Sequence, residues 1–147
     1  MYDNLLLATD GSKLSEKAVA HAIDLANRLG AKLTVFHAAP EYPSPIYTEG
    51  VTMEMMSKKA YVAGTAARSA AILDRIAKRA AAAGVPCETH HALSRSPSDA
   101  IVAAAKKYKC DAIVMGSRGH GGLKAFLIGS VTQKVLAQTK LPVIVAR

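Results

Sequence analysis

Short apolar runs alternate with longer segments of helical periodicity along this chain. The run at 4–9 is almost continuously apolar, which is typical of a strand buried on both faces of a parallel sheet. Apolar residues then recur at helical spacing from Leu14 to Leu29. Ser12 is the expected N-cap of this helix, and Gly30 is expected to end it. The start of the chain therefore predicts a strand, a turn and a helix.

The same two patterns recur to the end of the chain. Prolines at 40, 43 and 45 preclude regular structure in a loop that we expect to reach residue 52. The alanine-rich stretch after it contains Gly64, which leaves room for a kink or a break. At Ser96-Pro97-Ser98-Asp99 we expect Ser96 to cap a further helix. The remaining elements are strands at 32–38, 87–93, 112–115 and 141–147 and helices at 53–83, 97–109 and 130–139.

Strands that alternate with helices predict an α/β fold with a parallel sheet covered on both faces. Ligands of such sheets bind beyond the carboxyl ends of the strands, where the strand order reverses. Asp10 follows the first strand, and a glycine-rich segment follows the fourth. Both are therefore expected at the same edge, where they could contact one ligand.

Length and composition indicate one globular domain over residues 1–147, half of them hydrophobic. The longest apolar runs fall short of the roughly 20 residues of a membrane helix. The first ten residues lack the basic segment of a signal peptide, so we expect a cytoplasmic protein. Cys87 and Cys110 have no metal-ligand spacing, and we expect both thiols to be reduced.

The net charge of +8 fits either a partner that carries phosphate or a solvated basic surface. The basic residues are not interleaved with aromatic ones, and the chain contains no Trp. We therefore favour a solvated surface over a nucleic-acid site.

The glycine-rich segment has the spacing G-x2-G-x9-G-S, formed by Gly116, Gly119, Gly129 and Ser130. It lies between a strand and a helix start, an arrangement that binds phosphate through free N–H groups and the helix dipole. It is not a Walker A loop, because no glycine is followed by Lys and then Ser or Thr. Nor is it the dinucleotide fingerprint, because Lys124 stands where the third glycine belongs. The segment therefore predicts a nucleotide site of another kind.

These motifs together resemble the universal stress protein family over the whole chain. The resemblance rests on Leu-Ala-Thr-Asp-Gly-Ser at the start, Met-Gly-Ser-Arg-Gly-His-Gly-Gly, Gly-Ser-Val-Thr and the closing Leu-Pro-Val-Ile-Val. The spacing G-x2-G-x9-G-S/T is the signature of the ATP-binding branch of that family. The resemblance implies a Rossmann-like, doubly wound, five-stranded parallel sheet of order 3-2-1-4-5. It also implies a homodimer joined through the last strand, at Leu141, Pro142, Val143, Ile144, Val145 and Ala146.

The resemblance also implies a set of nucleotide-binding residues. Asp10 would lie near the nucleoside or a phosphate-bound Mg2+, although a turn-forming role is the alternative. Backbone at His37 and Ala38 would meet adenine, and Arg118 and His120 could reach phosphate. A β-branched residue at Gly116 or Gly119 is expected to block the ligand with little loss of folding. The full set is Thr9, Asp10, Gly11, Ser12, His37, Ala38, Met115, Gly116, Ser117, Arg118, Gly119, His120, Gly129, Ser130, Val131 and Thr132.

Three functions remain open at this stage. The first is an ATP-binding stress-response or signalling protein with at most slow hydrolysis, since no general base is evident. The second is a Mg2+-dependent ATPase or phosphotransferase, with Asp10 holding the metal. The third is a basic module that binds nucleic acid or protein. One departure from the family is Arg95-Ser96-Pro97, where many relatives have a glycine and an acidic residue before the proline.

Overall fold

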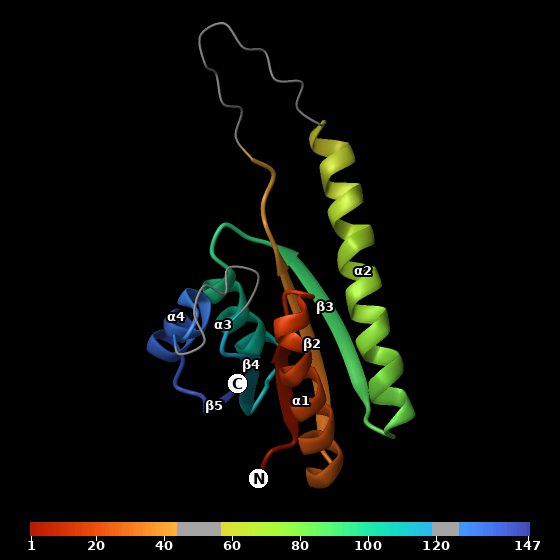
Figure 1. Ribbon diagram of the computed structural model, residues 1–147, viewed down its shortest axis with the longest axis vertical. Helices are drawn as coiled ribbons and strands as arrows, with labels where there is room; N and C mark the ends of the chain where they lie inside the picture. Colours follow the sequence, from red (N-terminus) through yellow and green to blue (C-terminus); the bar gives the residue numbers. More distant parts are fainter. Residues whose placement is uncertain (44–56, 119–126) are drawn as a thin grey trace, which may run out of the picture.

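The protein is described by a computed structural model that covers residues 1–43, 57–118 and 127–147. Five parallel strands form one sheet in the order β3-β2-β1-β4-β5 (Figure 1). The expected sheet order 3-2-1-4-5 is therefore confirmed. The strands are β1 (Asn4–Ala8), β2 (Lys32–Ala39), β3 (Cys87–Leu93), β4 (Ala112–Gly116) and β5 (Val143–Ala146). The helices are the 3-10 turn η1 (Lys13–Ser15), α1 (Glu16–Leu29), α2 (Lys58–Ala82), α3 (Pro97–Lys107) and α4 (Ser130–Gln138).

Helices cover both faces of the sheet. Leu5 and Leu7 of β1 point into a core that contains residues of α1 and α2. Leu6 and Ala8 point into a second core that contains residues of α3 and α4. This alternation explains why β1 is buried at every position and reads as an unbroken apolar run. The doubly wound arrangement is thus confirmed.

A buried polar network joins the strands at the amino-terminal edge of the sheet. The side chain of Asn4, which is 6% exposed, donates from Nδ2 to the Tyr108 carbonyl (3.0 Å) and accepts at Oδ1 from Thr34 Oγ1 (2.8 Å). The Asp111 carboxylate accepts from the backbone N–H of Asn4 at 2.8 Å. The buried side-chain amide therefore has partners on both sides, as a buried polar group requires.

The helix starts differ in part from expectation. Ser96 caps α3 as predicted, since its hydroxyl accepts from the Asp99 N–H (3.4 Å) with Pro97 in the first turn. Ser12 does not act as a side-chain cap. Its own N–H donates to Asp10 Oδ1 at 2.9 Å, so the Asp10 side chain closes the turn before η1 instead. The capping prediction for Ser12 was therefore wrong.

Helix α2 runs unbroken from Lys58 to Ala82, so Gly64 causes no break. The expected start of this helix at residue 53 lies outside the described residues. Its N-terminal half extends past the carboxyl ends of the strands, beside the chain that leaves β2 (Figure 1). This overhang supplies a wall to the space above the sheet.

The two cysteines are free thiols in different surroundings. Burial raises the pKa of the Cys110 thiol, and burial followed by the neighbouring Glu88 carboxylate raises the pKa of Cys87. Both thiols therefore stay protonated at neutral pH and are weak nucleophiles.

No helix in the described ranges has the length and apolarity needed to cross a membrane.

Replacing Gly64 by Ala should stabilise the protein. The residue is an exposed position inside α2, and an added Cβ meets no atom within 4 Å. We expect the free energy of unfolding to rise by about 1 kcal/mol, the propensity difference between the two residues. Chemical denaturation measures this change. On the same helix, Ala67→Gly is the matched control and should lower stability by about the same amount. An unchanged or lower stability of Gly64→Ala would contradict the regular helix at this point.

Candidate functional site

A cleft of about 1030 Å³ opens at the carboxyl edge of the sheet. Its walls come from the ends of β1, β2 and β4, from the overhanging half of α2, and from the start of α4. Most of the predicted nucleotide-binding residues line it: Thr9, Asp10, His37, Ala38, Met115, Gly116, Arg118, Gly129, Ser130, Val131 and Thr132. Gly11, Ser12 and Ser117 are not among the lining residues, and Gly119 and His120 lie outside the described residues. The cleft therefore lies at the carboxyl edge of the sheet, where the sequence predicts the ligand to bind.

Backbone contacts hold the base of the glycine-rich segment. Ser117 donates its N–H to the Ala146 carbonyl of β5 at 2.9 Å, and Gly129 donates to the Ser117 carbonyl at 2.6 Å. Thr132 donates from Oγ1 to the Gly116 carbonyl at 2.9 Å. The end of β4 and the start of α4 are thereby joined across the residues between them.

The glycines at this base lie in close backbone packing. A Cβ on Gly116 would lie 3.2 Å from the Arg118 carbonyl oxygen and near the η1 backbone, and a Cβ on Gly129 would lie 3.2 Å from the Ser117 carbonyl oxygen. The replacement of Gly116 with little loss of folding therefore stays a prediction, and it requires these backbone atoms to shift by a few tenths of an ångström. A side chain there would press on backbone, which cannot move aside as a flexible side chain can.

The N-terminus of α4 faces the cleft without a side-chain cap. Gly129 is its N-cap and offers no side chain, and the N–H groups of the first turn have no carbonyl partner within the helix. Ser130, Val131 and Thr132 of this turn line the cleft, together with the half-buried Arg118. Free N–H groups, the positive end of the helix dipole and a guanidinium group favour an anion here.

Side chains shape the turn after β1. The Thr9 hydroxyl accepts from the Gly11 N–H (3.1 Å) and contacts Ser15 Oγ (3.1 Å), whose own proton goes to the Ser12 carbonyl (2.7 Å). Gly11 has φ +77°, and an added Cβ would lie 2.5 Å from Ile72 Cδ1 of α2. The turn thus depends on Gly11, while Asp10 lines the cleft beside it.

His37 connects the end of β2 to α2. Its ring is 6% exposed, and its Nδ1 lies 2.8 Å from the hydroxyl oxygen of the buried Ser69. The neighbouring side chain, Phe36, points to the other face of the sheet, where it belongs to the second core. The imidazole therefore holds the cleft wall, and Ala38 lies at the cleft beyond it.

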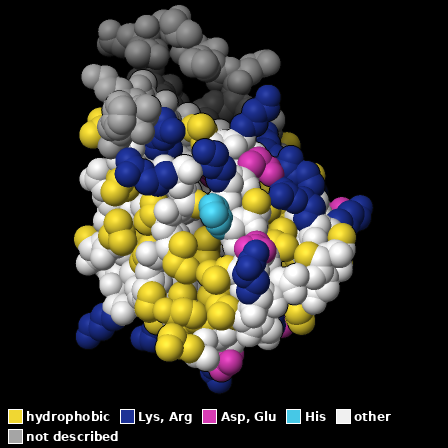
Figure 2. All heavy atoms as spheres, turned by 60° about the horizontal axis from the view of Figure 1, so that its bottom comes forward, with side chains coloured by type: hydrophobic (Ala, Val, Ile, Leu, Met, Phe, Trp, Pro, Cys, Tyr) yellow, Lys and Arg dark blue, Asp and Glu magenta, His cyan; other side chains and the backbone are white. Residues whose placement is uncertain are grey.

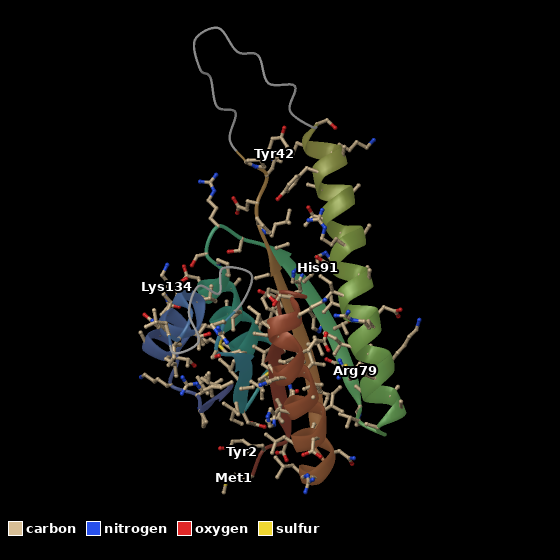
Figure 3. All side chains as sticks on the ribbon, viewed as in Figure 1. Met1, Tyr2, Tyr42, Arg79, His91 and Lys134 are labelled. Carbon is tan, nitrogen blue, oxygen red and sulfur yellow. The ribbon has the colours of Figure 1, made fainter. Side chains whose placement is uncertain are left out.

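The structure adds cleft residues that the sequence analysis missed. They come from the chain after β2, from α2 and from the turn after β3: Pro40, Glu41, Tyr42, Tyr61, Thr65, Arg68 and Ser94. Figure 3 shows Tyr42 beyond the end of β2, beside the N-terminal half of α2. The turn at Arg95, which the sequence places at the ligand edge, also lines the cleft. Glu41 follows a strand too, so the edge argument used for Asp10 could have found it. The α2 residues carry no such signal, because a helix pattern alone does not show which turn overhangs the sheet.

The described residues contain no group of three or more His, Cys, Asp or Glu side chains that could hold a metal ion. Asp10 is a carboxylate at the cleft. Mg2+ commonly binds through one or two carboxylates together with the phosphates of a substrate. The residues present therefore fit a metal that a nucleotide brings with it.

Comparison with known proteins agrees with this geometry. The family model for the universal stress protein family matches residues 1–147. A universal stress protein from Thermus aquaticus is 36% identical over 147 residues, which cover 100% of both chains. A crystal structure of a universal stress protein in complex with cAMP is 28% identical, with a TM-score of 0.71, over 99% of this chain and 97% of that chain. The universal stress protein from Archaeoglobus fulgidus in complex with dAMP shares the fold at 24% identity, with a TM-score of 0.69, over 99% of this chain and 98% of that chain.

The strand order, the cleft at the carboxyl edge and the match along the full length all lead to one conclusion. The chain belongs to the universal stress protein family.

Proposed function

We propose that this protein binds ATP in the cleft and serves as a cytoplasmic, nucleotide-dependent module of a stress response. The observation that carries the proposal is the uncapped N-terminus of α4, which faces the cleft beside Arg118. The related protein solved with cAMP supports a ligand of the adenine nucleotide class. The spacing G-x2-G-x9-G-S supports ATP within that class.

In this proposal the two parts of the nucleotide meet different surfaces. The phosphates accept from the first N–H groups of α4 and from the Arg118 guanidinium. The base packs against apolar side chains at the strand ends, where Phe36 and Met115 line the cleft and are almost fully buried. Apolar walls with few polar groups at one end are the usual composition of such a site.

Asp10 is the residue that we propose to hold Mg2+ together with the phosphates. When bound, the metal would neutralise phosphate charge. One oxygen of the carboxylate already accepts from the Ser12 N–H, which fixes its orientation at the cleft. The same bond also serves the turn, so the two roles proposed for Asp10 are compatible.

We further propose that hydrolysis of ATP is slow. An efficient ATPase requires a group that positions the attacking water in line with the leaving phosphate. The carboxylates that line the described cleft are those of Asp10 and Glu41. Glu41 is in an ion pair with Arg95 at 2.7 Å, at the other end of the cleft from α4. Neither carboxylate is free for that role.

The C-terminal strand supports a proposal for the oligomer. β5 is an edge strand in which Val143, Ile144 and Val145 are only half-buried. The unpaired backbone groups of such an apolar edge strand can pair with a strand of another chain. Figure 2 shows one face of the molecule, on which hydrophobic side chains gather in the lower middle and most Lys and Arg side chains lie above them and to the right. We propose a homodimer through residues 141–146.

Replacing Arg118 by Gln should weaken ATP binding by about tenfold or more, because a hydrogen bond to a charged group contributes roughly 1.5–3 kcal/mol. Calorimetric titration with Mg-ATP measures the change. Arg28→Gln is the control, since Arg28 is an exposed residue of α1 that pairs with Asp24 and does not line the cleft. If both variants and the unchanged protein bind Mg-ATP with equal affinity, the phosphates do not lie at this end of the cleft.

Steady-state turnover of Mg-ATP should stay below about 1 s⁻¹, the lower end of ordinary enzymes. The reason is that neither carboxylate among the described cleft residues, Asp10 or Glu41, is free to position water. A phosphate-release assay measures the rate, with Asp10→Asn as the comparison. A rate above this value that Asp10→Asn abolishes would establish the alternative, a true Mg2+-dependent ATPase.

Replacing Val145 by Pro should convert the proposed dimer into a monomer. The carbonyl oxygens of Pro142 and Ala146 accept hydrogen bonds from the backbone N–H groups of Ile113 and Ser117, so these two residues face β4. By alternation, Val143 and Val145 direct their N–H groups to the free edge. Proline removes one such donor and is tolerated in edge strands. Size-exclusion chromatography with light scattering checks the outcome, with Val145→Thr as the control. A variant that stays dimeric would show that the subunits join elsewhere.

A further inference from the structure

The cleft has a second end that the proposed function does not use. This end, which we call the far end, consists of Glu41, Tyr42, Tyr61 and Arg95. Glu41 follows β2 and Arg95 follows β3, whereas Arg118 follows β4. Arg68 lines the same cleft from α2, next to Ser69, which contacts His37. The inference below rests on the proposed function, because it concerns the same ligand.

Several contacts order the far end. Tyr61 donates its hydroxyl to the carbonyl oxygens of Pro40 (2.8 Å) and Glu41 (3.2 Å), which ties the chain after β2 to α2. The rings of Tyr42 and Tyr61 meet edge to face with centroids 5.4 Å apart. Arg95 donates from Nε to Glu41 Oε2 at 2.7 Å, which joins the turn after β3 to the same chain. Three separate segments thus build one wall.

Arg68 is the cation of this wall that remains available. Glu41, the acidic residue of the far end, is already paired with Arg95. Within the described ranges, Arg68 has no ion pair, and its side chain lines the cleft from an exposed position on α2. Thr65 and Ile72 of the same helix also line the cleft. Their spacing of three and four residues from Arg68 puts all three on one helical face.

The cleft therefore has guanidinium groups on two of its walls, Arg118 beside α4 and Arg68 on α2. Its volume of about 1030 Å³ is at the upper limit of ordinary small-molecule pockets, about 300–1000 Å³. An arginine fork matches phosphate and carboxylate groups equally well. We propose that Arg68 forms a second anion subsite, and that the cleft prefers an adenine nucleotide with a second anionic group away from its 5′-phosphates.

This chemistry has two sources in a nucleotide. The second anion is either a phosphate on the ribose 3′-hydroxyl or a carboxylate carried on the N6 atom of the base. Both leave the 5′-phosphates at α4 and extend a negative charge toward another part of the cleft. Adenosine 3′-phosphate 5′-triphosphate and N6-carboxymethyl-ATP are the two probes, each compared with ATP.

Calorimetric titration of the full chain at fixed ionic strength tests the proposal. At least one probe should bind about tenfold more tightly than ATP, a gain expected for one charge-assisted contact. Arg68→Gln should abolish this gain and leave the affinity for ATP unchanged. Arg75→Gln is the matched control, because Arg75 lies on the same helix, pairs with Glu16 and does not line the cleft. This variant should keep the gain.

The outcomes separate the two levels of the proposal. A gain with the 3′-phosphate probe alone assigns the subsite to the ribose side, and a gain with the N6 probe alone assigns it to the base side. ATP binding without a gain for either probe, or a gain that survives Arg68→Gln, would overturn the second subsite and leave the proposed function intact. A protein that binds none of the three nucleotides would overturn both.

Discussion

Five parallel strands can be joined only by crossovers that return the chain across a face of the sheet, and helices form those crossovers here. Every strand then ends at the same edge. Every turn that follows a strand, and the start of each helix after it, is brought to that edge too. The cleft, the turn at Asp10 and the N-terminus of α4 share one place because of this constraint. At the opposite edge, the side chain of Asn4 links β1 to Thr34 of β2 and to the Tyr108 carbonyl.

The two ends of the cleft are built in different ways. At the α4 end, backbone packs on backbone, and a Cβ on Gly116 or Gly129 would lie 3.2 Å from a carbonyl oxygen. At the far end, side chains provide the wall through the Tyr61 hydroxyl bonds and the Glu41–Arg95 pair. Backbone packing tolerates little change, whereas a side-chain wall can be altered one residue at a time. Under the proposed function, the α4 end would take a phosphate common to many nucleotides, and the far end a group that differs between them.

His37 illustrates how core and site share residues. Its ring is bonded to Ser69 inside the interface of β2 and α2, and the same residue lines the cleft. Thr132 is a second case, since its hydroxyl donates to Gly116 at the base of the glycine-rich segment and so holds the fold around the site. A residue expected from sequence to touch the ligand can therefore act mainly by holding the wall on which the ligand lies.

Local sequence patterns predict most of the strands and helices of this protein. The run of apolar residues in β1, the cap at Ser96 and the spacing of Gly116, Gly129 and Ser130 are short-range features, and each predicts its element or its edge without knowledge of the rest. The Ser12 side-chain cap failed because it depends on a neighbour: the Asp10 carboxylate accepts from the Ser12 N–H and closes the turn.

The sequence by itself determined the parallel α/β fold and the edge at which the cleft opens, because strand and helix periodicity and glycine spacing are local. Only the tertiary structure decided which turns of α2 line the cleft, and so brought Tyr61 and Arg68 into its wall. That choice depends on how a long helix packs along β2 and β3, and side chains distant in sequence meet only after this packing is complete.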